Sequence, residues 1–156
     1  MKVEGGFIVD APIDRVWRAI RDPDVVAPCI PGCQSVESLG DNSYKTSVRV
    51  ALGPIATTFN ATIKITEEQP PLRLACVTRG EEGGKASSLS AQSELVLSEL
   101  EGERTEVRYS SEASIFGRLG RYGLGMMKKK ADAIGAEFAT VFAARVLAMV
   151  AAEKSQ

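Results

Sequence analysis

The chain has 156 residues, a length typical of one domain, and its 44% hydrophobic and 25% charged residues exclude a mainly disordered protein. Lys and Arg total 19 against 20 Asp and Glu, so the formal net charge of −1 gives no general attraction for nucleic acid. Histidine is absent, which excludes Ser-His-Asp and Cys-His catalysis and histidine-bound metals. We therefore expect a single domain over residues 1–156 with no nucleic-acid partner and no metal.

The cysteines and the N-terminus indicate the cellular compartment. Cys29, Cys33 and Cys76 are an odd set without a C-x-x-C pair, which fits neither a disulfide framework nor a four-thiolate zinc site. The first residues lack the apolar core of a signal peptide, and the longest apolar run, residues 141–152, is interrupted by Arg145. These features predict a cytoplasmic protein without a membrane-spanning segment.

The first 33 residues predict one strand and two short helices. Alternating apolar residues predict a strand over residues 2–9. Over residues 11–20, Pro12 stands at a helix start and an apolar face recurs every three or four positions, which predicts an amphipathic helix. Asp22-Pro23-Asp24 can begin another helical turn, which the prolines and glycine of residues 28–32 must end.

Six further strands follow, over residues 35–39, 43–52, 55–66, 72–79, 87–100 and 105–115. Short turns between them predict an antiparallel meander with one apolar and one polar face. The polar face carries charged residues that we interpret as solvated rather than catalytic: Arg49, Lys64, Arg73, Arg79, Glu94, Glu106, Arg108 and Glu112.

A long helical pattern over residues 119–152 is expected to cover the apolar face of the sheet. Its inward residues are expected at spacings of four and three: Met127, Ala131, Ile134, Phe138, Val141 and Arg145. The predicted fold is therefore α+β, with a seven-stranded antiparallel sheet wrapped around a long C-terminal helix and two short helices after the first strand.

The residues between sheet and helix are candidates for an apolar ligand site. Shared strand parity and helical spacing predict a lining of Val50, Phe59, Ile63, Leu74, Leu89, Ser93, Tyr109, Ala113, Met127, Ala131, Ile134 and Phe138. A few hydroxyl groups lie on the same strand faces, namely Thr57, Thr78, Ser93, Tyr109 and Ser111. A filled core whose hydroxyls bond to the backbone is the other interpretation. No ionisable residue is expected to face inward before Arg145, so we expect no catalytic residue.

Residues 115–130 hold five cations and no acid among apolar side chains. Four glycines weaken the helix there, and apolar side chains beside cations suit an anionic membrane surface or an acidic partner. The residues expected to dock, at the mouth of the cavity, are Phe116, Arg118, Leu119, Arg121, Tyr122, Leu124, Met126, Lys128, Lys129 and Lys130. An ordinary helix start with a solvated lysine cluster is the alternative.

Several motifs resemble one known family. Residues 6–12 with Val16-Trp17, Ile30-Pro31-Gly32-Cys33, Gly53-Pro54-Ile55, the glycines around residues 80–84 and Gly117-Arg118-Leu119-Gly120 are similar to the carbon monoxide dehydrogenase G-subunit family, a branch of the START-like SRPBCC superfamily. The resemblance covers residues 2–145 and implies a helix-grip (START-like) fold that keeps a cavity.

The resemblance also implies an accessory protein that recruits a molybdenum-containing carbon monoxide dehydrogenase-type hydroxylase to the inner face of the cytoplasmic membrane. Such an enzyme passes its electrons to the respiratory chain, so we expect the cavity to bind a quinone or similar lipid rather than a resident cofactor. Two alternatives remain open at this stage: a START-like enzyme such as a cyclase or lyase, and a plain docking adaptor without a ligand.

Overall fold

The computed structural model describes residues 1–155, apart from the side chain of Lys85. The strands are β1 (Lys2–Val9), β2 (Cys33–Gly40), β3 (Ser43–Leu52), β4 (Ile55–Gln69), β5 (Arg73–Glu82), β6 (Ser87–Leu100) and β7 (Arg104–Gly117). The helices are α1 (Ile13–Ile20), α2 (Pro23–Val26) and α3 (Leu124–Lys154), and the short 3₁₀ helices are η1 (Ala27–Cys29), η2 (Gly83–Lys85) and η3 (Arg118–Tyr122).

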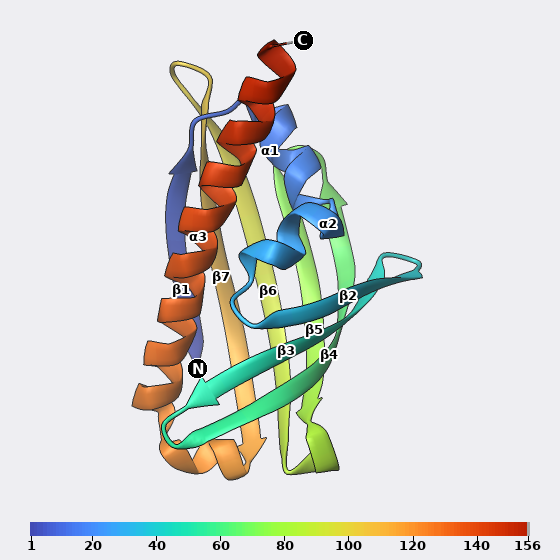
Figure 1. Cartoon of the computed structure of the whole chain (residues 1–156), viewed down its shortest axis with the longest axis vertical. Coiled ribbons are helices and arrows are strands. Elements are labelled where there is room, and N and C mark those ends of the chain that lie inside the picture. Colours follow the sequence, from blue (N-terminus) through green and yellow to red (C-terminus); the bar gives the residue numbers. More distant parts are fainter. Residues whose placement is uncertain (156) are drawn as a thin grey trace.

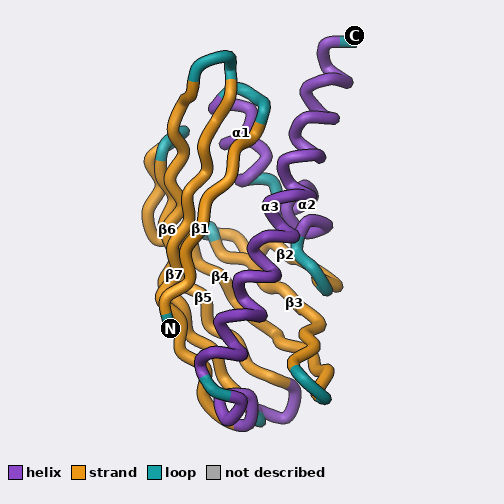
Figure 2. Tube along the Cα trace, turned by 90° about the vertical axis from the view of Figure 1, so that its left-hand side faces the viewer, coloured by secondary structure: helices purple, strands orange, loops and turns teal. Residues whose placement is uncertain are grey.

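All seven strands form one antiparallel sheet in the order β1-β7-β6-β5-β4-β3-β2. Strands β2 to β7 form the expected meander, and β1 adds to its edge beside β7. Figures 1 and 2 show that the sheet curls, so that β2 and β3 come round toward α3. The predicted α+β architecture of a seven-stranded sheet with a long C-terminal helix and two short helices is confirmed.

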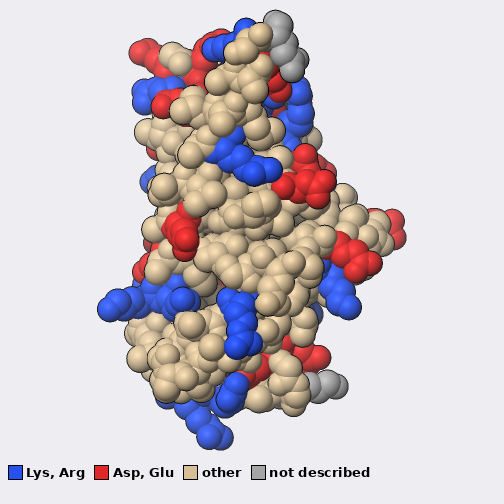
Figure 3. All heavy atoms as spheres, viewed as in Figure 1, with Lys and Arg blue, Asp and Glu red and all other residues tan. Residues whose placement is uncertain are grey.

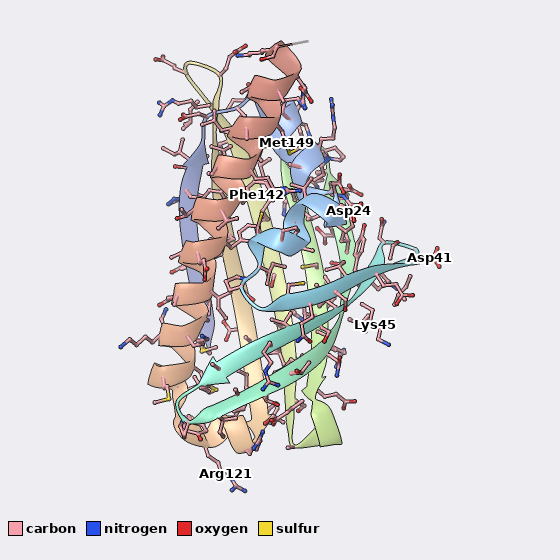
Figure 4. All side chains as sticks on the ribbon, viewed as in Figure 1. Asp24, Asp41, Lys45, Arg121, Phe142 and Met149 are labelled. Carbon is pink, nitrogen blue, oxygen red and sulfur yellow. The ribbon has the colours of Figure 1, made fainter. Side chains whose placement is uncertain are left out.

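Helix α3 runs along the inner side of the sheet and lies closest to β1 (Figure 2). Phe7 of β1 makes edge contacts with Phe138 and Phe142, whose ring centroids lie 6.5 and 6.2 Å from its own. Figure 4 shows Phe142 in the part of α3 that runs beside the short helices. An ion pair between Arg15 of α1 and Glu153 fixes the C-terminal end of α3 to α1.

The start of α3 differs from the prediction, because the chain forms η3 before the helix begins at Leu124. Gly117 and Gly123 bracket η3 with φ angles of 92° and 84°, in a region that favours glycine. These two glycines turn the chain on each side of η3, so that α3 starts five residues later than residue 119.

Gly32 in the Ile-Pro-Gly-Cys segment has a similar structural role. Its φ is 77°, its carbonyl accepts the Arg49 backbone N–H at 2.8 Å, and a Cβ atom at this position would collide with the Arg49 carbonyl. The glycine therefore allows the loop after η1 to pack directly against the backbone of β3.

By length and composition alone, the 31-residue α3 is apolar enough to cross a membrane. In this fold, however, Phe142 and Val146 lie in the buried core with exposed fractions of 0% and 1%. The helix also presents apolar residues to solvent on its other side, including Val141 and Leu147.

Candidate functional site

Strand register places all eight strand residues predicted to line the cavity on the face of the sheet that looks toward α3. Across the meander, Val50 pairs with Thr57, Ile63 with Thr78, and Leu95 with Tyr109. Predicted positions in β5, β6 and β7 follow the same alternation, so Leu74, Leu89, Ser93 and Ala113 share this face. We call it the inner face.

Buried residues of the interior form two separate clusters rather than one core. The upper cluster lies toward the C-terminal end of α3, at the top of Figure 1. It joins β1, α1, α2 and the C-terminal half of α3 around Val16, Leu97 and Phe142. The lower cluster contains Leu52, Phe59, Leu119 and Met127.

Between these clusters the inner-face side chains keep part of their surface accessible. We call this region the middle interior, and its half-buried residues are Ile63, Leu74, Cys76, Ser93, Tyr109 and Ser111. Ala131 and Ile134 of α3 are also half-buried. Side chains that face a helix and still retain accessible surface are not packed to the density of a closed core, so this part of the interior is the candidate ligand site.

Helix α3 turns a slightly different face inward than its spacing predicted. Met127 is buried and Phe138 packs against the upper cluster, as expected. Val141 is 38% exposed and Arg145 is exposed, however, so the prediction that they face inward is wrong. Because 3.6 residues make one turn, the inward stripe continues one position later, at Phe142 and Val146.

Three small polar groups meet in the middle interior on neighbouring strands. Ser93 pairs with Ser111 across β6 and β7 and with Cys76 across β6 and β5. The two serine Oγ atoms lie 2.8 Å apart, and Cys76 stands beside Ser93 on the neighbouring strand. Burial raises the pKa of the Cys76 thiol, which keeps it protonated and unreactive at neutral pH.

Tyr109 reaches the same region from β7. A Cβ atom added to Gly5 of β1 or to Gly135 of α3 would lie 2.5 Å from its hydroxyl oxygen. The phenol end therefore occupies a space between strand and helix that exists only because both positions are glycine. Sequence parity identified Tyr109 as inward-facing, but nothing in the sequence linked it to these two glycines.

Glu82 is a buried carboxylate that the sequence analysis missed. It is 1% exposed and pairs with Phe59 on the inner face, so the expectation of no inward ionisable residue is wrong. The single Nε–H of Arg118 in η3 is shared between both carboxylate oxygens at 2.9 Å, and its Nη2 also donates to Oε2. Ser87 Oγ donates another hydrogen bond of 2.9 Å. The strict alternation of β5 from Cys76 through Thr78 and Gly80 was the available signal, but β5 was predicted to end at residue 79.

The Arg118 guanidinium is the main reason that the pKa of Glu82 falls from 4.5 to about 2. The Ser87 hydroxyl also accepts the backbone N–H of Leu119 at 3.0 Å. Together these contacts hold η3 against β5 and β6, so that Leu119 closes the lower end of the interior.

The predicted docking segment divides into exposed and anchored residues. Phe116, Leu124 and Met126 are exposed, as expected, and Tyr122 is half-buried. Leu119 is only 2% exposed, so the expectation that it faces a membrane or partner is wrong. Arg118 bonds to Glu82, but 43% of its side chain stays exposed.

The other cations of the segment remain at the surface of the same end. Arg121, Lys128 and Lys129 are exposed, whereas Lys130 is half-buried. Lys128 lies 3.7 Å from Asp132, the next turn along the helix. Figure 3 shows Lys and Arg gathered over the lower end of this face, and Figure 4 shows Arg121 pointing outward from it.

Two hollows lie mainly over the outer side of the sheet, although Tyr109 also lines one of them and Cys76, Ser93 and Ser111 also line the other. Most of their lining residues are charged or polar, such as Glu4 and Arg108 in one and Gln92 and Glu112 in the other. Arg73 and Glu94 on this face are already paired at 2.8 Å. These hollows therefore suit an apolar ligand less well than the middle interior does. Among residues 1–155 no group of three or more Cys, Asp and Glu side chains could hold a metal ion.

Comparison with known proteins identifies the family. The model of the family named for the G subunit of carbon monoxide dehydrogenase (CoxG) matches residues 5–147. The chain belongs to the CoxG family. No curated protein matches the chain.

Solved structures share the fold of this CoxG family member. A conserved protein from Geobacillus kaustophilus has a TM-score of 0.87 at 22% identity, covering 94% of this chain and 95% of that chain. The Zhui aromatase/cyclase from Streptomyces sp. R1128 has a TM-score of 0.70 at 18% identity, covering 96% and 95%. A protein from Thermus thermophilus has the same TM-score at 16% identity, covering 96% and 99%. These proteins have the START-like, helix-grip fold, which together with the family suggests a ligand-binding cavity protein.

Proposed function

We propose that this CoxG family member is a non-catalytic cavity protein that binds a quinone or similar lipid. In this role it links a molybdenum-containing carbon monoxide dehydrogenase-type hydroxylase to the inner face of the cytoplasmic membrane. The family name supports the association with carbon monoxide dehydrogenase. The family resemblance also implies the ligand, the membrane and the cytoplasmic location, and the chemistry of the chain is consistent with them.

The observation that carries the proposal is the middle interior. Its residues are mostly apolar and half-buried, and they lie between two clusters of closely packed side chains. Ligand sites in proteins are mainly apolar with a few polar groups, and this region has that composition. A quinone suits it, because a quinone combines an apolar ring and tail with two carbonyl oxygens.

A membrane surface is the proposed source of this ligand. The lower end of the molecule presents Phe116, Leu124 and Met126 to solvent beside Arg121 and Lys129. Apolar side chains can enter the lipid interface while cations meet anionic head groups. The same end lies next to η3, whose Leu119 closes the interior.

A catalytic role is less well supported by the interior. Of the described residues, Glu82 is the one charged side chain that is fully buried, and its carboxylate is occupied by Arg118 and Ser87. A general acid or base at neutral pH needs a pKa near 7, whereas the pKa of Glu82 falls to about 2. Turnover of an added substrate that is abolished by Glu82→Gln would instead favour a START-like enzyme.

Native mass spectrometry tests the ligand proposal directly. After incubation with a membrane lipid extract, we expect one bound lipid per chain, which fragmentation can identify. Ala131→Trp, at a half-buried position of α3, should fill the middle interior and abolish binding, whereas Ala133→Trp at an exposed position should not. A wild-type mass that never changes, or equal binding by the two variants, would contradict the proposal.

A further inference from the structure

Two serines of the middle interior form a hydrogen-bonded pair. Cys76, Ser93 and Ser111 lie side by side on β5, β6 and β7, and the Oγ atoms of Ser93 and Ser111 lie 2.8 Å apart. Each of the three side chains carries one hydrogen that it can donate. The contact between Ser93 and Ser111 uses only one of the two hydroxyl hydrogens, so one serine donor remains for another acceptor.

A second donor stands beside this serine pair. Tyr109 lies two positions before Ser111 on the same strand face, roughly 6–7 Å away along the strand. Within residues 1–155, no hydrogen bond engages its hydroxyl, which Gly5 and Gly135 confine between β1 and α3. An unpaired polar group in a partly desolvated place is costly, so both donors favour an incoming acceptor.

The surroundings of these donors define the charge of the group that they would bind. The nearest inner-face neighbours, such as Ile65, Leu74, Thr78 and Leu95, are uncharged. The buried Glu82–Arg118 pair is neutral as a unit and lies six residues along β5 from Cys76. A charged group would lose its hydration here without gaining a partner of opposite charge.

We propose that Ser93, Ser111 and Tyr109 bind the polar end of an otherwise apolar ligand, and that this end is an uncharged acceptor such as a carbonyl oxygen. This inference rests on the proposed function and adds to it the location and chemistry of the polar contact. Ser111 or Ser93 and Tyr109 donate, and the apolar remainder of the ligand lies against Ile63, Leu74 and Ile134.

Duroquinone and durene separate this inference from the proposed function. Both are a ring with four methyl groups, but durene lacks the two carbonyl oxygens. Duroquinone also has no free ring position for the Cys76 thiol to attack. The probes are titrated against the whole chain, and binding is followed by NMR.

The test variant is Ser93→Ala/Ser111→Ala, and the matched control is Ser90→Ala/Ser114→Ala. Ser90 and Ser114 pair across the same two strands on the outer face. We expect the test variant to bind duroquinone about three- to tenfold more weakly and durene with unchanged affinity. The control variant should bind both probes as the wild type does. Tyr109→Phe should weaken duroquinone binding separately.

The other possible results distinguish a failure of the polar-contact inference from a failure of the proposed function. If the test variant binds duroquinone as tightly as the wild type, or loses both probes equally, the inference is wrong and the proposed function stands. If the wild type binds neither probe, the middle interior is not a site for an apolar ligand of this kind, and both fail.

Discussion

At the scale of single residues, the position of the Tyr109 side chain requires glycine at two neighbouring positions. Its hydroxyl lies against Gly5 and Gly135, one on each side. Glycine within a helix costs about 0.5–1 kcal/mol relative to alanine. Gly135 therefore weakens α3 but makes room for the tyrosine between strand and helix.

This arrangement predicts that Gly135→Ala and Tyr109→Phe are coupled. With Tyr109 present, the added methyl group forces the phenol toward the middle interior, and we expect the free energy of unfolding to fall by about 1–2 kcal/mol. In the Tyr109→Phe background the closest atom is gone, and the same substitution should raise the free energy of unfolding by about 0.5–1 kcal/mol. Urea unfolding of the four proteins measures both effects.

Additive effects in that cycle would show that Tyr109 and Gly135 do not contact each other. A control is Gly125→Ala in the first turn of α3, where a Cβ atom meets nothing within 4 Å. The effect of Gly125→Ala on the free energy of unfolding should be the same with tyrosine or phenylalanine at position 109.

At the scale of elements, η3 closes the lower end of the interior and is held by one carboxylate. Glu82 bonds to Arg118 and Ser87, and Ser87 in turn binds the Leu119 backbone N–H. Because the pKa of Glu82 is lowered by folding, its contribution to stability is complete above about pH 4.5 and is lost as pH falls through about 2.

We therefore expect acid and Glu82→Gln to release η3. At neutral pH, Glu82→Gln should reduce the hydrogen-exchange protection of the Leu119 amide by about tenfold or more, because the charged acceptor of Arg118 is lost. In the wild type, the Leu119 amide chemical shift should change as the pH falls through about 2, where Glu82 of the folded protein takes up a proton. Glu81→Gln, one residue earlier on the exposed outer face, serves as the control. Protection that is the same in all three proteins would contradict this role of Glu82.

The elements themselves could be predicted well from the sequence, because period-two and helical patterns record which face is buried. Strands β1, β3 and β6 begin and end where alternation predicted. The sequence pattern predicted too early a start for α3. A glycine with a positive φ, such as Gly123, can end one element and begin another without changing the hydrophobic pattern.

The candidate site could be predicted only in part, for a related physical reason. The alternation of strand side chains between the two faces of the sheet identified Ser93 and Tyr109 as inward-facing. It could not show that Arg118 folds back onto Glu82, since that contact joins residues separated by 36 positions. The helical spacing, in turn, could not identify the inward residues of α3 beyond Phe138. A helix has 3.6 residues per turn, so its inward face gradually shifts away from positions spaced alternately by four and three residues.

At the scale of the whole molecule, the two ends of the interior differ in how they are closed. The upper end is filled by α1, α2 and the C-terminal half of α3, whose aromatic rings stack, with 5.4 Å between the Phe138 and Phe142 centroids. At the lower end, closure depends on Leu119 and on the short η3. A ligand that enters from a membrane therefore meets fewer packed side chains at the lower end, which is also the end with exposed apolar and cationic residues.

This asymmetry predicts that the lower end binds anionic vesicles. Lys128→Glu/Lys129→Glu should weaken association by more than about thirtyfold. Losing two basic residues, each worth about 1 kcal/mol near an anionic surface, accounts for about thirtyfold, and the two new carboxylates are repelled in addition. Added salt should also weaken the association of the wild type, because surface charges are screened beyond about 8 Å at physiological ionic strength. Lys45→Glu/Lys64→Glu makes the same change of net charge on exposed residues of β3 and β4 and should have little effect.

Cosedimentation with vesicles that contain phosphatidylglycerol measures this association, and titration with duroquinone in solution provides the second readout. We expect affinity for duroquinone to be unchanged in Lys128→Glu/Lys129→Glu, because both lysines are exposed and lie outside the middle interior. Leu124→Ala/Met126→Ala should weaken vesicle association even at high salt, since it removes apolar rather than charged contacts. If neither charge reversal nor salt alters vesicle binding, the cationic residues are an ordinary solvated helix start, and the membrane must be reached through another surface.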